Sequence, residues 1–265
     1  MQSLIKNTLV TFATFLTTIV MVGTANGEEA GGEWLASIGY SNSNFSRIQR
    51  KDWQAKNIFL SRKVNDDTSL NITLVQENRF ATSDTSIGGG LSHNFADGAY
   101  GNISFYVTPS SNFLARYALS ADGGVKVWEG GGVFGPTIAT VNLLHKDYAS
   151  GDSENIDPGF VQYMAKMPFW ISAKWINSFS KKPQKRTGGY SLKLDWQATE
   201  NIRPFAGFSF APEIDGGVVT NVKTRFAGAI YNLNPDTNIR LDYAGEDRKN
   251  SYLRNSYSIG FSRRF

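Results

Sequence analysis

The sequence contains no cysteine and only two histidines, His93 and His145. The absence of cysteine excludes disulfide bonds and thiolate metal sites, and two histidines are too few for a histidine-built metal centre. The chain also lacks the series of apolar runs, each of about 20 residues, that a multi-pass helical membrane protein needs. Apolar residues make up 41% and aromatic residues 13%. A disordered chain is therefore excluded as well.

Residues 1–27 have the features of a secretory signal peptide. Lys6 is the only charged residue, an apolar stretch runs from Leu9 to Gly23, and small residues follow at Gly23, Ala25 and Gly27. We expect export, with cleavage after Ala25 or Gly27 and residues 28–265 as the mature domain. An N-terminal membrane anchor is the alternative, although the stretch is short for a span.

Charge is balanced in the mature region. Without Lys6 it has 26 basic and 23 acidic residues, a dispersed net charge of +3. Nucleic-acid binders carry a stronger and more concentrated positive charge. We therefore expect no nucleic-acid partner.

The mature region alternates between apolar and polar residues along its whole length. Leu70, Ile72 and Leu74 alternate with Asn71 and Thr73, and similar stretches of about ten residues recur. A period of two places the two sets on opposite faces of a β-strand. The apolar face would look into the core of a soluble sandwich, or out to lipid in an outer-membrane barrel.

The lengths of the connections favour the barrel. Short turns and longer polar connections alternate, as in an up-and-down barrel with turns in the periplasm and loops outside. The longer connections are expected at Asn42–Lys51, Ala149–Asp157, Phe179–Thr187 and Pro212–Val219. We predict an all-β fold, a single antiparallel transmembrane barrel of about fourteen strands; twelve is the alternative, because alternation is weak in the second and eighth. The expected strands are 33–41, 52–63, 68–78, 84–95, 99–108, 114–127, 137–148, 158–166, 169–178, 188–198, 202–211, 220–233, 238–246 and 251–265.

Aromatic residues near the strand ends support the same fold. We expect two interfacial girdles, with Trp34 and Trp196 on the turn side and Trp53 and Tyr252 on the loop side. The last expected strand is amphipathic and ends in Phe265, the feature that outer-membrane barrels present to the barrel-assembly machinery. The predicted location is the outer membrane of a diderm (Gram-negative) bacterium, with the C-terminus in the periplasm and outer-membrane lipid and lipopolysaccharide as surroundings.

From Trp34 to Phe265 the sequence resembles the YaiO family of outer-membrane β-barrels. The resemblance rests on the order and spacing of several segments; Arg263 stands where the family has an aromatic residue. These segments are Tyr40–Phe45 with Asp52-Trp53, Arg79-Phe80, Asp84–Gly88, Tyr148–Asp152, Trp175–Asn177, Tyr190–Thr199, Glu246–Tyr252 and Arg264-Phe265. The resemblance implies fold and location, and it supplies no catalytic residues.

The residues indicate no catalytic, cofactor-binding or metal site. His145, Asp147 and Asp152 lie near the outer end of one expected strand, where omptin-type proteases place catalytic groups, but parity turns His145 and Asp147 towards lipid. No second cooperating pair accompanies them. We expect a non-enzymatic protein without a cofactor.

Strand parity predicts the residues that line the lumen. They are Glu77, Arg116, Asp122, Lys174, Lys193, Asp195, Arg203, Arg240, Asp242 and Arg254. Six are basic and four acidic, so the lumen is expected to be slightly basic and to favour small anions or acidic saccharides if it is open. Lys193, Arg203, Arg240 and Arg254 are expected to form one basic wall, and no long constriction loop is expected.

We therefore expect a narrow channel or a surface or export component. The alternatives are an outer-membrane hydrolase or acyltransferase and a purely structural or adhesive barrel. An open lumen and a lumen filled by paired side chains are the two alternatives for its interior.

Overall fold

The computed structural model describes residues 33–46, 52–95, 98–181, 184–215, 218–249 and 251–265; the expected signal peptide lies outside them. Fourteen antiparallel strands form one closed barrel, and two short strands form a separate hairpin. The barrel strands are β1 (Trp34–Ser46), β2 (Trp53–Lys63), β3 (Thr68–Arg79), β4 (Thr82–Phe95), β5 (Ala99–Val107), β6 (Tyr117–Trp128), β7 (Phe134–Tyr148), β8 (Gly151–Met164), β9 (Phe169–Lys181), β10 (Gln184–Trp196), β11 (Ile202–Phe210), β14 (Val222–Asn234), β15 (Thr237–Arg248) and β16 (Leu253–Arg264). In these residues no helix is long and apolar enough to cross a membrane.

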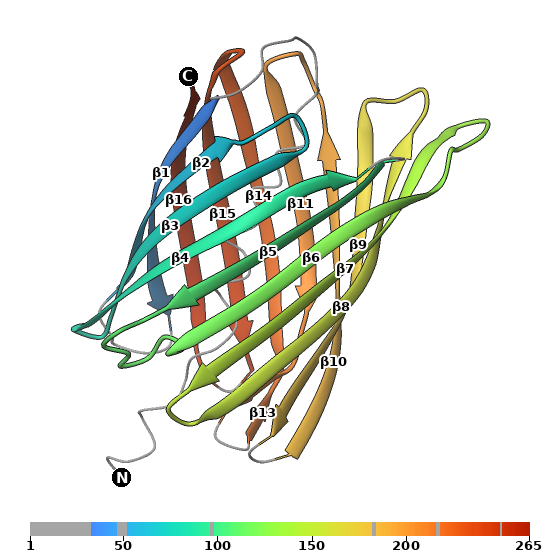
Figure 1. Ribbon diagram of the computed structural model, residues 1–265. Coiled ribbons are helices and arrows are strands. Elements are labelled where there is room, and N and C mark those ends of the chain that lie inside the picture. Colours follow the sequence, from blue (N-terminus) through green and yellow to red (C-terminus); the bar gives the residue numbers. More distant parts are fainter. Residues whose placement is uncertain (1–32, 47–51, 96–97, 182–183, 216–217, 250) are drawn as a thin grey trace.

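The first and last strands close the barrel. β1 pairs with β16 from Leu35 opposite Arg264 to Ser46 opposite Leu253. Backbone hydrogen bonds continue to the end of the pair, where Trp34 N donates to the Phe265 carbonyl at 2.8 Å. In Figure 1 the C-terminus accordingly lies beside the start of β1. The prediction of fourteen strands is confirmed, and the alternative of twelve is wrong.

The expected long polar connections are mostly strand. β1 continues to Ser46, and β8 already begins at Gly151. β9 continues to Lys181, and β10 begins at Gln184. Between β11 and β14, β12 (Glu213–Asp215) and β13 (Val218–Thr220) form the separate hairpin. Beyond the lipid both faces of a hairpin meet water, so no apolar alternation marks these residues although their backbones stay paired.

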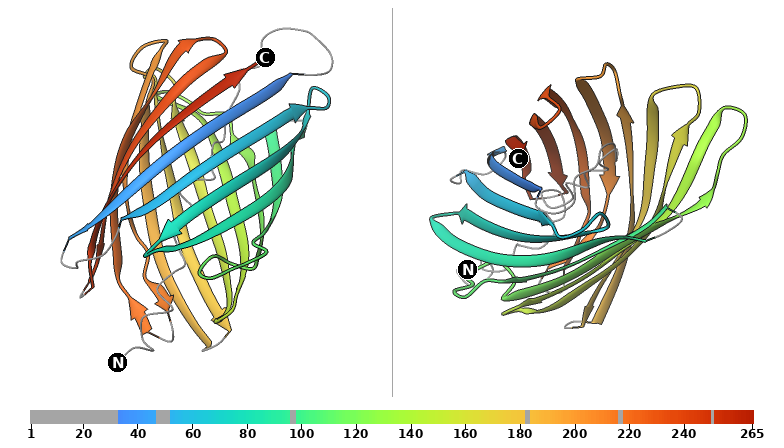
Figure 2. Two further views of the ribbon diagram at one scale, coloured as in Figure 1. Left: turned by 90° about the vertical axis from the view of Figure 1, so that its left-hand side faces the viewer. Right: turned by 45° about the horizontal axis from the view of Figure 1, so that its top comes forward.

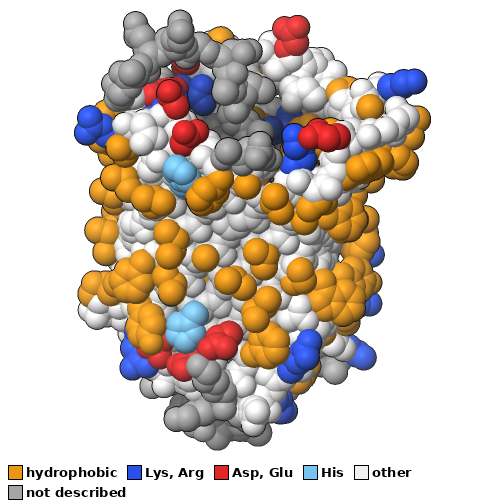
Figure 3. All heavy atoms as spheres, turned by 45° about the vertical axis from the view of Figure 1, so that its right-hand side comes forward, with side chains coloured by type: hydrophobic (Ala, Val, Ile, Leu, Met, Phe, Trp, Pro, Cys, Tyr) orange, Lys and Arg blue, Asp and Glu red, His pale blue; other side chains and the backbone are white. Residues whose placement is uncertain are grey.

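The barrel is apolar outside and polar inside. Outward side chains such as Ile38, Ile72 and Leu241 are more than half exposed, whereas Ser37 and Thr73 on the inner face are buried. On the face shown in Figure 3, apolar side chains form a band and charged ones gather towards both ends. The strands are tilted with respect to the barrel axis (Figure 2). This is the surface that a bilayer requires of a spanning β-barrel.

Two expected members of the loop-side girdle are inside the barrel. Trp53 and Tyr252 are 7% and 4% exposed. Trp53 shares its face with Asn57 and Phe59, and the register places Phe59 opposite the inward Ser37. Closeness to a strand end, the basis of the prediction, does not determine which face a side chain occupies.

Candidate functional site: the charged lumen

The strand register turns nine of the ten predicted lumen residues to the inner face: Glu77, Asp122, Lys174, Lys193, Asp195, Arg203, Arg240, Asp242 and Arg254. The tenth, Arg116, was predicted wrongly. It precedes β6, and its Nε lies 2.6 Å from Oδ2 of Asp147, a residue that shares the outward face of β7 with His145. This hydrogen-bonded carboxylate raises the pKa of the Arg116 guanidinium.

A compact ionic group lies in the lumen at the loop end, the end of the barrel where β1 leads to β2 and β15 to β16. Glu246 accepts from two arginines: Arg254 Nη2 lies 2.7 Å from Oε2, and Arg248 Nε lies 2.9 Å from Oε1. On β3, Arg79 Nε donates to Oε2 of Glu77 at 2.9 Å. All five charges face inward, and Glu246 and Arg254 are almost completely buried.

Aromatic rings pack between these charges. The Cζ atoms of Arg79 and Arg254 lie 4.5 and 4.6 Å from the centre of the Trp53 ring. Phe45 packs edge-on against both Trp53 and Tyr252, with ring centres 5.1 Å apart in each case. Cation–π contacts of this kind gain strength when they are desolvated. We name this set the loop-side cluster: Phe45, Trp53, Glu77, Arg79, Glu246, Arg248, Tyr252 and Arg254.

The connection between β5 and β6 folds onto the loop-side cluster. Asp84, on the inner face of β4, accepts hydrogen bonds from the backbone N–H groups of Asn112, Phe113 and Leu114 at 3.0, 2.8 and 2.7 Å. The Phe113 ring then lies 4.7 Å from Arg79 Cζ. The sequence predicted no long constriction loop. This short connection nevertheless folds inward, because the buried Asp84 carboxylate satisfies several backbone donors that would otherwise stay unpaired.

A second charged group lies nearer the turn end. Lys193 Nζ is 2.8 Å from Oδ1 of Asp195, and Arg240 Nη2 is 2.8 Å from Oδ1 of Asp242. Lys193 Nζ and Arg240 Cζ lie 4.7 and 5.0 Å from the centre of the Phe205 ring. These charges are only partly buried, apart from Asp195.

Arg203 completes this group. Its Cζ lies 5.8 Å from the centre of the Trp170 ring, and Trp170 stacks with Tyr163. Arg203 is close enough to Lys193 for the two positive charges to repel each other. We name this set the turn-side cluster: Tyr163, Trp170, Lys193, Asp195, Arg203, Phe205, Arg240 and Asp242. It holds three cations and two carboxylates, and Arg254 belongs instead to the loop-side cluster, so the single basic wall expected from the sequence is divided in two.

Part of the wall formed by β5 to β9 is accessible to solvent, although Lys146 and Asp157 on its inner face are buried. Ser104, Ser120, Asp122 and Asn142 are partly exposed and Lys174 is exposed. Their register neighbours show that all of them face the lumen. Solvent therefore reaches part of the inner surface of β5 to β9 and the turn-side cluster, whereas Glu246 and Arg254 of the loop-side cluster are closed to it.

The residues weighed for catalysis stay on the outside. His145 Nδ1 lies 3.5 Å from Oε1 of Glu154, and the Tyr117 ring lies beside the imidazole. Asp147 is bound by Arg116. In the part of the chain that the structure describes, no three His, Cys, Asp or Glu side chains are grouped so that they could hold a metal ion.

Sequence reasoning missed Arg79, Glu246 and Arg248 as inner residues. All three are at strand ends, where alternation with apolar neighbours stops. Extending the parity of Thr73 to Arg79 and that of Asp242 to Arg248 would have placed them inside. Their mutual contacts depend on closure of the barrel and could not be read in this way.

No protein-family model matches the sequence, and no curated protein sequence matches it. Solved outer-membrane barrels are similar in structure. The outer membrane protein opdK from Pseudomonas aeruginosa has a TM-score of 0.50 at 9% identity, over 89% of this chain and 98% of that chain. The anion-selective porin from Comamonas acidovorans has a TM-score of 0.49 at 8% identity, over 89% of this chain and 99% of that chain. At these identities the similarity concerns the fold.

The closed barrel, its apolar outer band and its polar lumen agree with that fold. Together they place the chain in the bacterial outer membrane, which it spans as a fourteen-stranded β-barrel.

Proposed function

We propose that the protein is a narrow, non-enzymatic channel of YaiO type that passes small anions or acidic saccharide units. The observation that supports this most directly is the solvent accessibility of several inward side chains on β6, β7 and β9, namely Asp122, Asn142 and Lys174. A lumen filled by paired side chains would leave such residues buried. Water along this wall gives a solute a polar path through the barrel.

The bore is narrow because the opposite wall is packed. Phe205, Phe226 and Arg254 are buried on the inner faces of β11, β14 and β16. The β5–β6 connection narrows the mouth further through its contact between Phe113 and Arg79. We therefore expect small conductance, in contrast to that of wide porins.

Selectivity is assigned to the turn-side cluster. This cluster has three cations and two carboxylates, so its net charge is +1. The side chains of the cations, Lys193, Arg203 and Arg240, are partly accessible. Charged side chains around a pore set the sign of the ion that passes. A weak preference for anions follows.

Planar-bilayer recording tests the channel. Purified full-length barrel should give small, weakly anion-selective steps in a KCl gradient, and the K193Q/R240Q variant should shift the reversal potential towards cation preference. R62Q/R263Q removes the same charge from outward positions at the turn end and should leave the reversal potential unchanged. A folded wild-type barrel that never conducts would contradict the channel.

A structural barrel is the second candidate. The loop-side cluster favours it, since Glu246 and Arg254 are almost completely buried and occupy part of the lumen without access to solutes. If the wild-type barrel is silent in bilayers while variants of this cluster lose heat resistance, the structural role replaces the channel.

A further inference from the structure

We propose that the outer surface of β10, β11 and β14 at the loop end binds the phosphate groups of the glycolipid in the outer leaflet. Three cations, Arg186, Lys223 and Arg225, are exposed there. They face away from the lumen, so the channel gives them no role. This proposal does not depend on the proposed channel.

The register fixes the outward direction of these side chains. Lys223 lies opposite Phe210 and Arg225 opposite Phe208, while Tyr190 on β10 also lies opposite Phe210. The outward side chains Tyr190 and Phe208 are well exposed. The cations therefore stand among aromatic side chains of the kind that mark the interface between lipid and water.

Arg186 and Lys223 lie at the height of the bilayer edge, and the long side chain of Arg225, two residues nearer the membrane centre, can extend to the same level. Trp196 and Arg186 lie on the same face of β10, and Leu233 and Lys223 on the same face of β14, each pair separated along the strand by ten positions. A strand that rises about 3.3 Å per residue and tilts by about 40° covers roughly 25 Å over this length, the height of the apolar band of an outer-membrane barrel. A cation deeper in lipid would be costly, whereas at this level it meets the headgroups.

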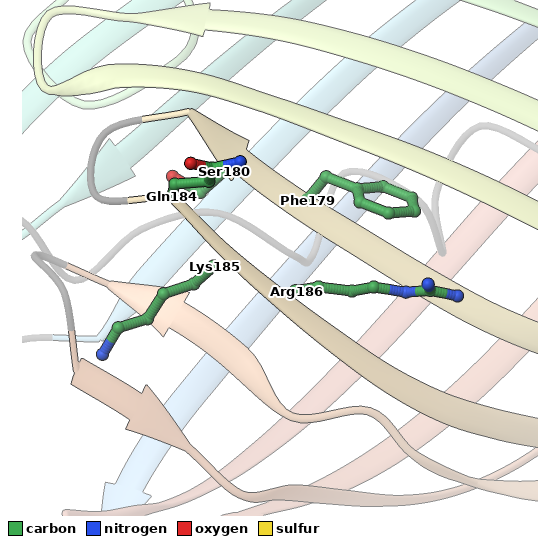
Figure 4. Close-up of a pocket in the computed structure, with 5 residues that line it drawn as sticks. All are labelled: Phe179, Ser180, Gln184, Lys185 and Arg186. Carbon is green, nitrogen blue, oxygen red and sulfur yellow. The ribbon is translucent and has the colours of Figure 1, made fainter.

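Arg186 is held in position at the tip of the β9–β10 hairpin. Its Cζ lies 5.2 Å from the centre of the Phe179 ring. Figure 4 shows the two side chains extending along the same side of the hairpin, in a groove also lined by Ser180, Gln184 and Lys185. A guanidinium group oriented in this way can donate two parallel hydrogen bonds to a phosphate.

Around the loop end of the barrel, the outward charges are mainly negative on β7 and β8 and mainly positive on β10 to β14. At the loop end of β7 and β8 the outward residues include Asp147, which Arg116 pairs, together with Asp152 and Glu154, whose carboxylates would repel a phosphate. Beside the proposed site Asp247 lies opposite Lys223, and among the outward side chains that the structure describes at the loop ends of β10, β11, β14 and β15 the cations outnumber the carboxylates. Charge complementarity therefore directs an anionic headgroup to β10–β14 and away from β7–β8.

The experiment uses the full-length barrel reconstituted in phosphatidylcholine vesicles, with bisphosphorylated lipid A, dephosphorylated lipid A or phosphatidylglycerol added at equal amounts. Bound lipid is counted by native mass spectrometry, and the heat-modifiable gel shift reports stability. Bisphosphorylated lipid A should bind and raise the temperature of the gel shift, and dephosphorylated lipid A should not.

The R186Q/K223Q/R225Q variant should bind bisphosphorylated lipid A more than about tenfold more weakly, since each basic residue near an anionic surface strengthens binding several-fold. R62Q/K166Q/R263Q removes three charges at the turn end and should bind like the wild type. If the first triple variant does not fold, R186Q/K223Q serves in its place. Unchanged binding by the folded variant, or equal stabilisation by phosphatidylglycerol, would overturn the proposal.

Discussion

Glu246 and Arg254 face each other across the β15–β16 pair and form an ion pair of 2.7 Å in which each side chain is 2% exposed. Arg248 binds the other oxygen of the same carboxylate. In the nearly dry lumen wall, each of these charges is tolerated only because its partners are present. The stability of the loop end therefore depends on contacts that span several strands.

Removing the shared carboxylate should be more harmful than removing all three charges. We expect E246M to lower the free energy of unfolding by about 3–5 kcal/mol, because Arg248 and Arg254 then stay buried without it. The E246M/R248M/R254M triple variant should lose less than E246M alone. Urea titration of the reconstituted barrel, followed by tryptophan fluorescence, measures both. Equal losses in the single and triple variants would argue against a desolvated ionic group.

Substitutions in the two charged clusters should affect different properties, ion selectivity in one case and heat resistance in the other. R240Q should shift ion selectivity with a small effect on heat resistance, since Arg240 is partly accessible. R254Q should lower heat resistance and leave selectivity unchanged, because Arg254 is buried in the loop-side cluster. Reversal potentials and heat-modifiable gels, recorded on the same preparations, measure the two effects. A selectivity change in R254Q would place Arg254 in the conducting path.

Asp84 should hold the β5–β6 connection in place. D84N keeps the size of the side chain but turns one acceptor into a donor facing the N–H groups of residues 112–114, at a cost of about 1–3 kcal/mol. We expect lower heat resistance and larger conductance as the connection releases Phe113 from Arg79. D122N removes a carboxylate from the accessible wall and serves as the control. The same conductance change in both variants would mean that charge, and not the loop, is responsible.

Two adjacent glycines should respond differently to alanine. A Cβ at Gly88 would lie 2.9 Å from the Phe105 carbonyl oxygen and would meet the Tyr106 ring, whereas a Cβ at Gly89 would have ordinary contact with the Asn71 carbonyl oxygen at 3.5 Å. G88A should therefore cost about 1–3 kcal/mol through overpacking, and G89A should be close to neutral. Urea unfolding of both variants checks this, and an equal response would contradict the packing of Tyr106 over Gly88.

Alternation by two along the chain determined the barrel, the number of its strands and the face of most side chains. Leu70, Ile72 and Leu74 point outward because lipid accepts only apolar side chains, and Lys193, Asp195 and Arg240 point inward for the same reason. Where lipid ends, this constraint ends too. For this reason the predicted eighth strand began at residue 158 and not at Gly151, where β8 begins. For the same reason Arg116 was assigned to the lumen, and Trp53 and Tyr252 to the outer girdle.

Tertiary structure alone decided which charges meet. Trp53 and Arg79 belong to β2 and β3, and Arg254 belongs to β16, nearly the whole chain away; they become neighbours only because β1 pairs with β16. Parity gives the face of a residue, but the closure register gives its height and its neighbours around the barrel. That register divides the expected basic wall into a buried loop-side cluster and a partly accessible turn-side cluster.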